Sequence, residues 1–266
     1  MELQTGQEID SYRVIAPIGR GSLGAVYLAE HMLIGHNVAI KVLSANACQD
    51  RTLVKRYFNE ARAASLLLHP SMVPVHDVRK YGRDRAYTIM PYLRGETLDA
   101  HLRRHYILSV SRALTITRQI VDALFVAHAN YIVHRGLQSN NVLLVDEPAA
   151  PGGRRVKLLD FGLARLRELS GPMLSLYGSN VPPWLHFVSP EQCRGYSEID
   201  CRSDLYMVGC LLYQMLCGQP PFAAGSAERV VHGHLHERPR APQTLNPSIP
   251  YDLDVLIRRL LAKQPD

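Results

Sequence analysis

The first part of the chain alternates apolar and polar residues as β-strands do. This alternation appears in five stretches, at residues 12–17, 25–30, 37–43, 73–79 and 85–90. Between the third and the fourth, apolar residues recur every three or four positions from Leu53 to Leu68, which predicts a helix. His69-Pro70 should end it, because proline disfavours helix in the residue before it. The pattern predicts a small, mostly β half with one helix.

From about Leu98 the apolar spacing becomes helical. It predicts helices at residues 109–129, 201–216, 228–234 and 252–262, and an exposed turn at 148–155 between two short strands. The apolar stretch 205–216 is shorter than the roughly 18 residues of a membrane helix, which favours a buried helix. We therefore expect two halves, residues 1–92 and 93–266, with a linker near Pro91–Gly95.

Composition narrows the class of protein. The 266 residues are 47% hydrophobic and 20% charged, as in a soluble globular domain. The formal charge is +6, but the basic residues are scattered and form no stripe with aromatic residues, which argues against a nucleic-acid partner. Five cysteines without C-x-x-C spacing fit a reducing compartment. We expect a cytoplasmic location, with no signal peptide and no membrane segment within this chain.

A glycine-rich stretch, Gly19-Arg20-Gly21-Ser22-Leu23-Gly24, could let the backbone approach phosphate groups. A dinucleotide-binding loop of this spacing should open a helix, whereas residues 25–29 form a strand pattern, so that alternative is disfavoured. Further motifs follow in order: Val38-Ala39-Ile40-Lys41, Leu159-Asp160-Phe161-Gly162, Ser189-Pro190-Glu191 and Asp204-Leu205-Tyr206 with Gly209.

Together these motifs resemble the bacterial eukaryotic-like (Hanks-type) Ser/Thr protein kinases over residues 12–263. The resemblance implies an α+β, bilobal fold with a small, mostly β N-lobe and a larger, mostly α C-lobe. It also implies ATP and Mg²⁺ as cofactors and a protein partner in signalling. The chain ends at Asp266, before the Arg that pairs with the Glu191 position in such kinases, so we expect the natural protein to continue.

The resemblance also implies a set of binding residues. Those expected around the nucleotide are Ile18, Gly19, Gly21, Gly24, Val26, Ala39, Lys41, Glu60, Met90, Pro91, Leu93 and Leu143. Lys41 would contact the α- and β-phosphates and pair with Glu60. Pro91 and Leu93 would form the hinge, where Pro91 can offer only its carbonyl because it has no N–H. Asn141 and Asp160 would bind Mg²⁺, which prefers oxygen ligands.

The catalytic loop departs from this family pattern. In His134-Arg135-Gly136-Leu137-Gln138, Gly136 stands where kinases have the catalytic Asp, and Gln138 stands where they usually have Lys. General acid–base catalysis contributes about 10²–10⁴-fold to rate, so Gly136 removes a large contribution. Trp184 replaces the Thr that would link the substrate loop to the catalytic Asp. No catalytic residue is therefore intact.

Three interpretations follow. The leading one is a pseudokinase that binds ATP–Mg²⁺ and acts as a signalling or scaffolding module. The alternatives are an active, slow Ser/Thr kinase and an interaction domain with a collapsed pocket. His186 is the nearest titratable substitute for the base, although a surface role is the commoner one. The histidines of His232-Gly233-His234-Leu235-His236 could bind a metal, but a purely structural role is favoured.

Overall fold

The computed structural model describes residues 3–21, 24–81, 85–161, 177, 180–195, 199–223 and 225–264. Within these ranges, five side chains are not described: those of Arg56, Glu60, Ala63, Tyr81 and Arg85. The chain forms two compact units, Met1–Arg94 and Gly95–Asp266.

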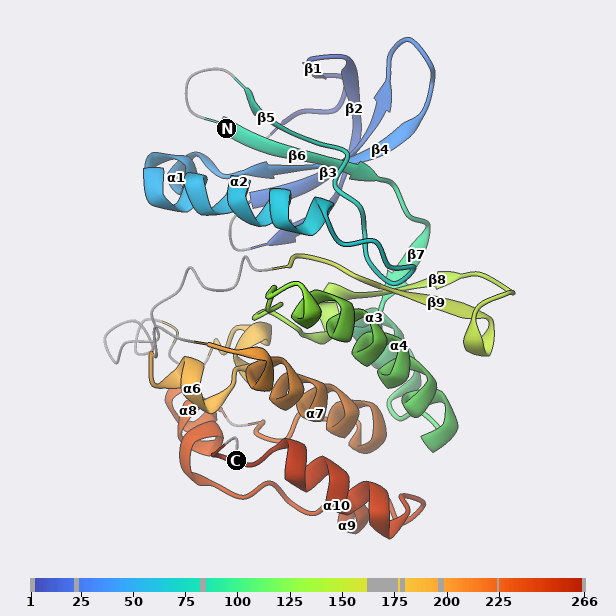
Figure 1. The fold of residues 1–266 in the computed structure, drawn as a ribbon, viewed down its shortest axis with the longest axis vertical. Helices are drawn as coiled ribbons and strands as arrows, with labels where there is room; N and C mark the ends of the chain where they lie inside the picture. Colours follow the sequence, from blue (N-terminus) through green and yellow to red (C-terminus); the bar gives the residue numbers. More distant parts are fainter. Residues whose placement is uncertain are drawn as a thin grey trace. The chain divides into compact units, whose positions relative to one another are not determined.

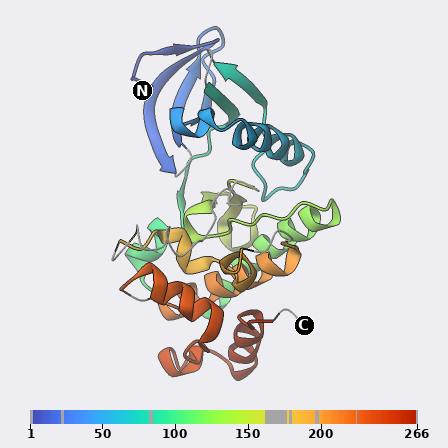
Figure 2. The same cartoon turned by 90° about the vertical axis from the view of Figure 1, so that its left-hand side faces the viewer.

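The first unit is an antiparallel sheet with two helices (Figure 1). Its strands, in the spatial order β1-β2-β3-β4-β6-β5, are β1 (Glu8–Ile9), β2 (Tyr12–Gly21), β3 (Gly24–His31), β4 (Asn37–Leu43), β6 (Arg85–Pro91) and β5 (Asp77–Tyr81). The helices α1 (Ala45–Gln49) and α2 (Arg51–Ser65) lie along one face of the sheet (Figure 2). Side chains from β1, β2, β3, β4 and β6, among them Ile9, Ile40 and Tyr87, form the core.

Two predicted boundaries in this unit are wrong. The helix ends at Ser65 and not at Leu68, and Leu68 is 89% exposed, so the apolar spacing runs on past the part that packs. The strand predicted at 73–79 begins only at Asp77. Pro74 precedes it, and a proline cannot donate to a strand ladder. The short elements β1 and α1 were not predicted, because neither is long enough to show a period.

The second unit is mostly helical. Its α-helices are α3 (Leu98–His105), α4 (Val110–Ala129), α6 (Pro190–Cys193), α7 (Cys201–Cys217), α8 (Ala227–His236), α9 (Pro242–Leu245) and α10 (Tyr251–Leu260). Its 3₁₀ turns are η1 (Ser139–Asn141), η2 (Pro151–Gly153) and η4 (Pro183–Phe187). A three-stranded antiparallel sheet joins β7 (Gly95–Thr97), β8 (Val142–Asp146) and β9 (Arg154–Leu158) in that order.

The helix α7 forms the centre of this unit. It begins at the N-cap Asp200, ends at Gly218 in the left-handed conformation (φ 76°), and is buried over most of its length. A Cβ on Gly209 would lie 2.8 Å from the Cβ of Leu260, so α10 packs closely against α7 at this glycine. The helices predicted at 109–129 and 201–216 are confirmed, each with one bound shifted by a residue.

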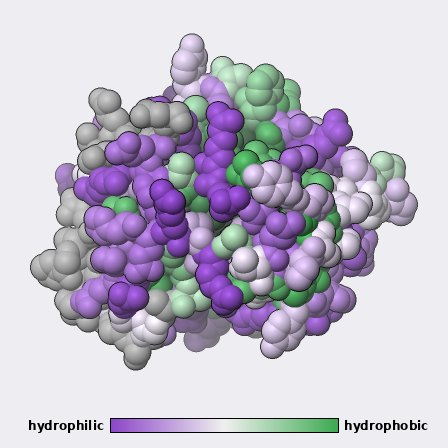
Figure 3. Space-filling view, turned by 90° about the horizontal axis from the view of Figure 1, so that it is seen from below, coloured by the Kyte–Doolittle hydropathy of each residue, from purple (hydrophilic) through white to green (hydrophobic). Residues whose placement is uncertain are grey.

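Hydrophilic residues predominate on the face of the molecule seen in Figure 3. In the part of the chain that the structure describes, none of the helices has the length and apolar content needed to cross a membrane.

Candidate nucleotide-binding and catalytic residues

The glycine-rich stretch forms the end of the β2–β3 hairpin, where Gly19 pairs with Val26 and Gly21 with Gly24. Residues 22–23 lie outside the described residues. A Cβ on Gly24 would lie 1.9 Å from the carbonyl oxygen of Val42, so packing within the unit excludes any side chain there. For Gly19 and Gly21 the nearest atoms of the described residues would be 3.8 and 4.0 Å away. The packing of this unit therefore requires a glycine only at Gly24 among the three.

Four predicted nucleotide contacts share one face of the first sheet. Ala39 and Lys41 are two residues apart on β4, and two-residue spacing puts side chains on the same face. Val26 lies opposite Lys41, and Met90 lies opposite Ala39. Directly paired residues also share a face. Ala39 and Lys41 are buried, whereas Val26 and Met90 are half-buried. The register therefore brings these four positions together.

Helix α2 is held against this same face by Tyr57. The Tyr57 hydroxyl donates to the carbonyl oxygen of Lys41 at 3.1 Å and also bonds the hydroxyl of Thr88, which lies opposite Lys41. Glu60 is three residues further along α2, a spacing that puts it near the same side of the helix. Its side chain is not described, so the Lys41–Glu60 pair stays a prediction.

The remaining predicted contacts of the first unit lie at strand ends. Ile18 is 45% exposed on β2, beside a β-bulge between Pro17 and Gly19. Pro91 is the last residue of β6 and pairs with Val38. Leu93 is half-buried in the segment between β6 and β7. The structure thus places each of them without testing contact with a nucleotide.

In the second unit, the backbone of the catalytic loop is held by Asp204 on α7. Its carboxylate is fully buried and accepts hydrogen bonds from the N–H groups of His134 and Arg135, both at 2.8 Å. The imidazole Nε2 of His128 lies 2.7 Å from the same carboxylate. Asp204 therefore fixes two consecutive peptide groups directly before Gly136.

The carbonyl groups that follow are also held. Arg135 has a φ of 62°, an uncommon conformation for a residue other than glycine. Its carbonyl accepts a 2.8 Å hydrogen bond from the side-chain amide of Gln192 on α6. The next carbonyl, that of Gly136, accepts one from Asn141 Nδ2 at 2.8 Å. The Gly136 N–H donates to His134 Nδ1 at 3.3 Å. The loop is therefore held although position 136 has no side chain.

His134 is itself a residue of this loop. Its ring is fully buried and contacts the Phe161 ring, with 4.4 Å between the centroids. Burial lowers the pKa of His134 below its usual value, an effect that the charges of Asp204 and Asp160 partly oppose. A neutral imidazole here packs as an apolar ring against Phe161, next to Asp160.

Asn141 and Asp160 offer the oxygen atoms expected of a Mg²⁺ site. Because Asn141 donates through Nδ2 to Gly136, its Oδ1 remains as the other end of the amide, and no described residue donates a hydrogen bond to it. Asp160 is exposed and has a φ of 62°. The Asn141 carbonyl accepts a hydrogen bond from the Leu159 N–H at 2.9 Å, which ties the two segments together. The donor set fits a hard divalent cation.

The predicted adenine contact Leu143 lies on β8, opposite Thr97 on β7 and Lys157 on β9. It is half-buried, whereas its neighbours Val142 and Leu144 are buried on the other face. Burial lowers the pKa of the Lys157 ammonium group below its usual value. One face of this sheet therefore carries Leu143 beside a partly desolvated cation.

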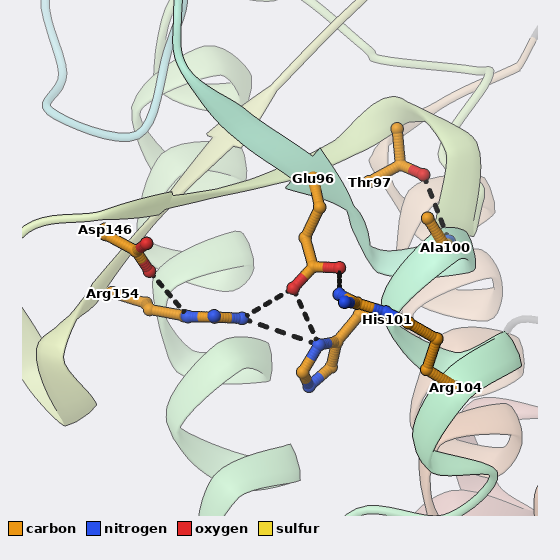
Figure 4. A network of polar contacts seen from close by, with 7 residues as sticks. All are labelled: Glu96, Thr97, Ala100, His101, Arg104, Asp146 and Arg154. Atoms are coloured by element: carbon orange, nitrogen blue, oxygen red, sulfur yellow. Dashed lines mark hydrogen bonds and ion pairs between the residues drawn. The ribbon is translucent and has the colours of Figure 1, made fainter.

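A polar network ties the same sheet to α3 (Figure 4). The carboxylate of Glu96 on β7 accepts from Arg154 at 3.0 Å, from Arg104, and from His101 Nδ1 at 3.0 Å. Arg154 also pairs with Asp146 at 2.9 Å. Burial and nearby arginines lower the pKa of His101 to about 4. The network anchors the strand that directly follows the predicted hinge.

The other departures from the kinase pattern also have structural contexts. Gln138 is half-buried and precedes η1. Trp184 in η4 packs on an apolar cluster built from η4, Val188, α6 and α8. Its ring meets that of Tyr177 edge-on, with 6.5 Å between the centroids. His186 Nδ1 lies 3.0 Å from the Phe222 carbonyl oxygen, so this nitrogen makes a structural hydrogen bond. Glu191 bonds the hydroxyl of Ser203.

The histidines of α8 do not converge. His234 is fully buried and bonds the Tyr206 hydroxyl at 2.9 Å, and its burial lowers its pKa to about 3. His232 is exposed, pairs with Glu237, and packs against the ring of His236. Among the residues that the structure describes, no three His, Cys, Asp or Glu side chains could hold a metal ion together.

Sequence reasoning missed two residues of this site. Tyr57 carried no signal beyond its place in the helical stripe. Gln192 could have been found, because Ser189-x-x-Gln192 is the spacing of a capping box, in which the Gln side chain bonds the N-cap N–H. The structure confirms that box.

The sequence model of the family described as "Protein kinase domain" matches residues 12–266. This chain belongs to the protein kinase family. It is 36% identical over 258 residues to a probable serine/threonine-protein kinase of Streptomyces coelicolor, a match that covers 96% of this chain and 37% of that protein. It is 36% identical over 262 residues to the serine/threonine-protein kinase Pkn1 of Myxococcus xanthus, covering 98% and 36%.

A solved structure, the kinase domain of PknI from Mycobacterium tuberculosis, is similar with a TM-score of 0.75 and 26% identity, covering 99% of this chain and 92% of that one. The predicted bacterial Hanks-type family and the α+β, bilobal kinase fold are thereby confirmed. The kinase chain spans 37% and 36% of the two curated relatives. Members of this family in general use ATP with a divalent metal and have protein substrates.

Proposed function

We propose that this kinase domain binds ATP with Mg²⁺ and acts as a pseudokinase, a signalling or scaffolding module that does not transfer the phosphate efficiently. The observation that carries the proposal is the loop around Gly136. Asp204, Gln192 and Asn141 hold its backbone, yet position 136 has no group that can take a proton from a hydroxyl. The frame for positioning is kept and the base is missing.

Each residue set has a role in this proposal. The described residues leave room for a Cβ at Gly19 and Gly21, so packing does not explain these two glycines. Their lack of a side chain would let phosphate groups approach the backbone closely. Lys41 would contact the phosphates, while Val26, Ala39, Met90 and Leu143 would enclose the adenine. Asn141 and Asp160 would hold Mg²⁺, which offsets phosphate charge when bound. Gln138 is a neutral amide and cannot offset charge on the transferring group as a lysine would.

We further propose a protein partner and a cytoplasmic location. The partner follows from the family's use of protein substrates. All five cysteines are free thiols, which supports a reducing compartment.

The proposal is tested by thermal unfolding with ATP and Mg²⁺. Binding should stabilise the domain by about 2.7 kcal/mol at a hundredfold excess over Kd. Lys41→Met and Asp160→Ala should lose most of this effect, and wild-type protein should transfer no labelled phosphate to itself or to a generic acceptor. No shift at millimolar ATP would reject nucleotide binding. Label transfer that disappears in both variants would establish the alternative, a slow Ser/Thr kinase.

A further inference from the structure

The side chain of Gln192 makes two hydrogen bonds to two different segments. Its Oε1 accepts from the N–H of Ser189 at 3.0 Å, which completes the capping box of α6. Its Nε2 donates to the carbonyl of Arg135 at 2.8 Å, a contact between residues 57 positions apart. One amide therefore joins the start of α6 to the catalytic loop.

The loop contact falls on a point of conformational strain. Arg135 is in the left-handed region with φ 62°, which the surrounding structure must enforce. Asp204 holds its N–H and Gln192 holds its carbonyl, each at 2.8 Å. Without the hydrogen bond from Gln192, Asp204 would still hold the N–H of Arg135, but the Arg135 carbonyl would lose this donor.

The contact also lies one peptide away from a predicted metal ligand. The Gly136 carbonyl, directly after that of Arg135, accepts from Asn141 Nδ2. This bond sets which way the Asn141 amide is turned and so where its Oδ1 points. Because Gly136 has no side chain to brace the loop, a rotation of the 135–136 peptide would also turn the Gly136 carbonyl.

We propose that Gln192 is a positioning residue, which orients the Asn141 amide through the Arg135 and Gly136 carbonyls and couples the Ser189–Cys193 segment to the metal-binding side of the loop. The metal part of this inference rests on the proposed function. The loop part does not, because it concerns only contacts within the second unit.

The chemistry of the two bonds separates the two roles of Gln192. The capping box needs only an acceptor, and Glu serves there as well as Gln. The contact with Arg135 needs a donor, which an ionised Glu lacks. Gln192→Glu therefore keeps the cap and removes the coupling. Ser189→Ala is the matched control, since it removes the hydroxyl that accepts from the Gln192 N–H at 3.4 Å and leaves the Arg135 contact in place.

The first measurement is amide hydrogen exchange in residues 134–141, without nucleotide. Loss of one hydrogen bond should speed exchange there about tenfold in Gln192→Glu, with little change in Ser189→Ala. Gln192→Met, uncharged and of similar length, also lacks the donor to Arg135. A similar rise in exchange in this variant would show that the effect does not come from the charge of Glu. Unchanged exchange in both Gln192 variants, or an equal rise in Ser189→Ala, would overturn the inference.

The second measurement is calorimetric ATP binding as a function of Mg²⁺ concentration. Gln192→Glu removes a residue that orients a metal ligand, so the Mg²⁺ concentration needed for half-maximal ATP binding should rise about tenfold. ATP binding in EDTA should stay as in wild type. Equal Mg²⁺ dependence in wild type and variant would overturn the coupling to the metal side. If wild type binds no ATP, the proposed function fails, and the exchange experiment still decides the role of Gln192 in the loop.

Discussion

The buried carboxylate of Asp204 accepts the backbone N–H of Arg135 at 2.8 Å, although the two residues are 69 positions apart. The same carboxylate accepts the N–H of His134 and meets His128. Three donors from α4 and the catalytic loop thus depend on one side chain at the start of α7.

Asp204→Ala should therefore destabilise the domain by about 3 kcal/mol, because it leaves buried donors without an acceptor. Urea unfolding measures the change. Asp122→Ala, which removes an exposed carboxylate from α4, is the control and should change stability by less than about 0.5 kcal/mol. Similar losses in the two variants would show that Asp204 does not support the loop.

Gly24 and Gly21 should respond differently to a methyl group. Gly24→Ala would place a Cβ 1.9 Å from the Val42 carbonyl, so the strands must separate and we expect a loss of about 2 kcal/mol. Gly21→Ala meets no atom of the described residues closer than 4.0 Å and should leave the unfolding midpoint nearly unchanged. If Gly21 serves phosphate approach, its variant should weaken ATP binding instead. Equal destabilisation by the two substitutions would contradict the packing argument.

Asp10 should anchor the N-terminal strand through Tyr87. The Tyr87 hydroxyl donates to the Asp10 carboxylate, and Arg79 pairs with it at 3.2 Å. Tyr87→Phe keeps the buried ring and should cost about 1 kcal/mol. Tyr12→Phe, on β2 of the same sheet, removes a hydroxyl that bonds no described residue and should be neutral. A double-mutant cycle with Asp10→Asn would show no coupling if the contact were unimportant.

The same contact predicts a dependence on pH. The hydrogen bond from Tyr87 lowers the pKa of Asp10 below its usual value of 3.8. A lowered carboxyl pKa contributes stability above the unfolded-state pKa, and this is lost as the pH falls through the folded-state value. Tyr87→Phe should therefore cost less in acid than at neutral pH.

Two buried histidines should weaken the fold as the pH falls from neutral toward 4. Burial lowers the pKa of His101 to about 4 and that of His234 to about 3, from a usual value of 6.5. Between the folded and the unfolded pKa values, the unfolded chain binds more protons than the folded one, so the free energy of unfolding decreases as the pH is lowered. Urea unfolding from pH 7.5 to 5 measures the slope. His101→Asn should reduce it, whereas substitution of the exposed His36 should not.

Much of the fold could be predicted because its signals are periodic. The strands around Ala39 and the helix of Leu211 repeat their apolar positions for long enough to fix their type. β1 could not be predicted, since two residues show no period and Ile9 is buried only once the core of the first sheet has assembled. The helical stripe was extended too far because Leu68 fits the spacing but packs on nothing that buries it.

The candidate site divides in a similar way. Motifs single out Gly24, Lys41, Asn141 and Asp160 as candidates from sequence because the chemistry expected of them is tied to local spacing. The contact of Gln192 with Arg135 could not be predicted, because it joins segments 57 positions apart through one amide hydrogen. The register that puts Met90 beside Ala39 likewise exists only once the strands have paired.

The bracing of the catalytic loop has a consequence for how this domain can change over time. Asp204, Gln192 and Asn141 fix the backbone on both sides of position 136, so the identity of that residue is separate from folding. A lineage can lose the catalytic carboxylate here without losing the domain. If the proposed function holds, selection on this chain acts on what it binds and not on what it phosphorylates.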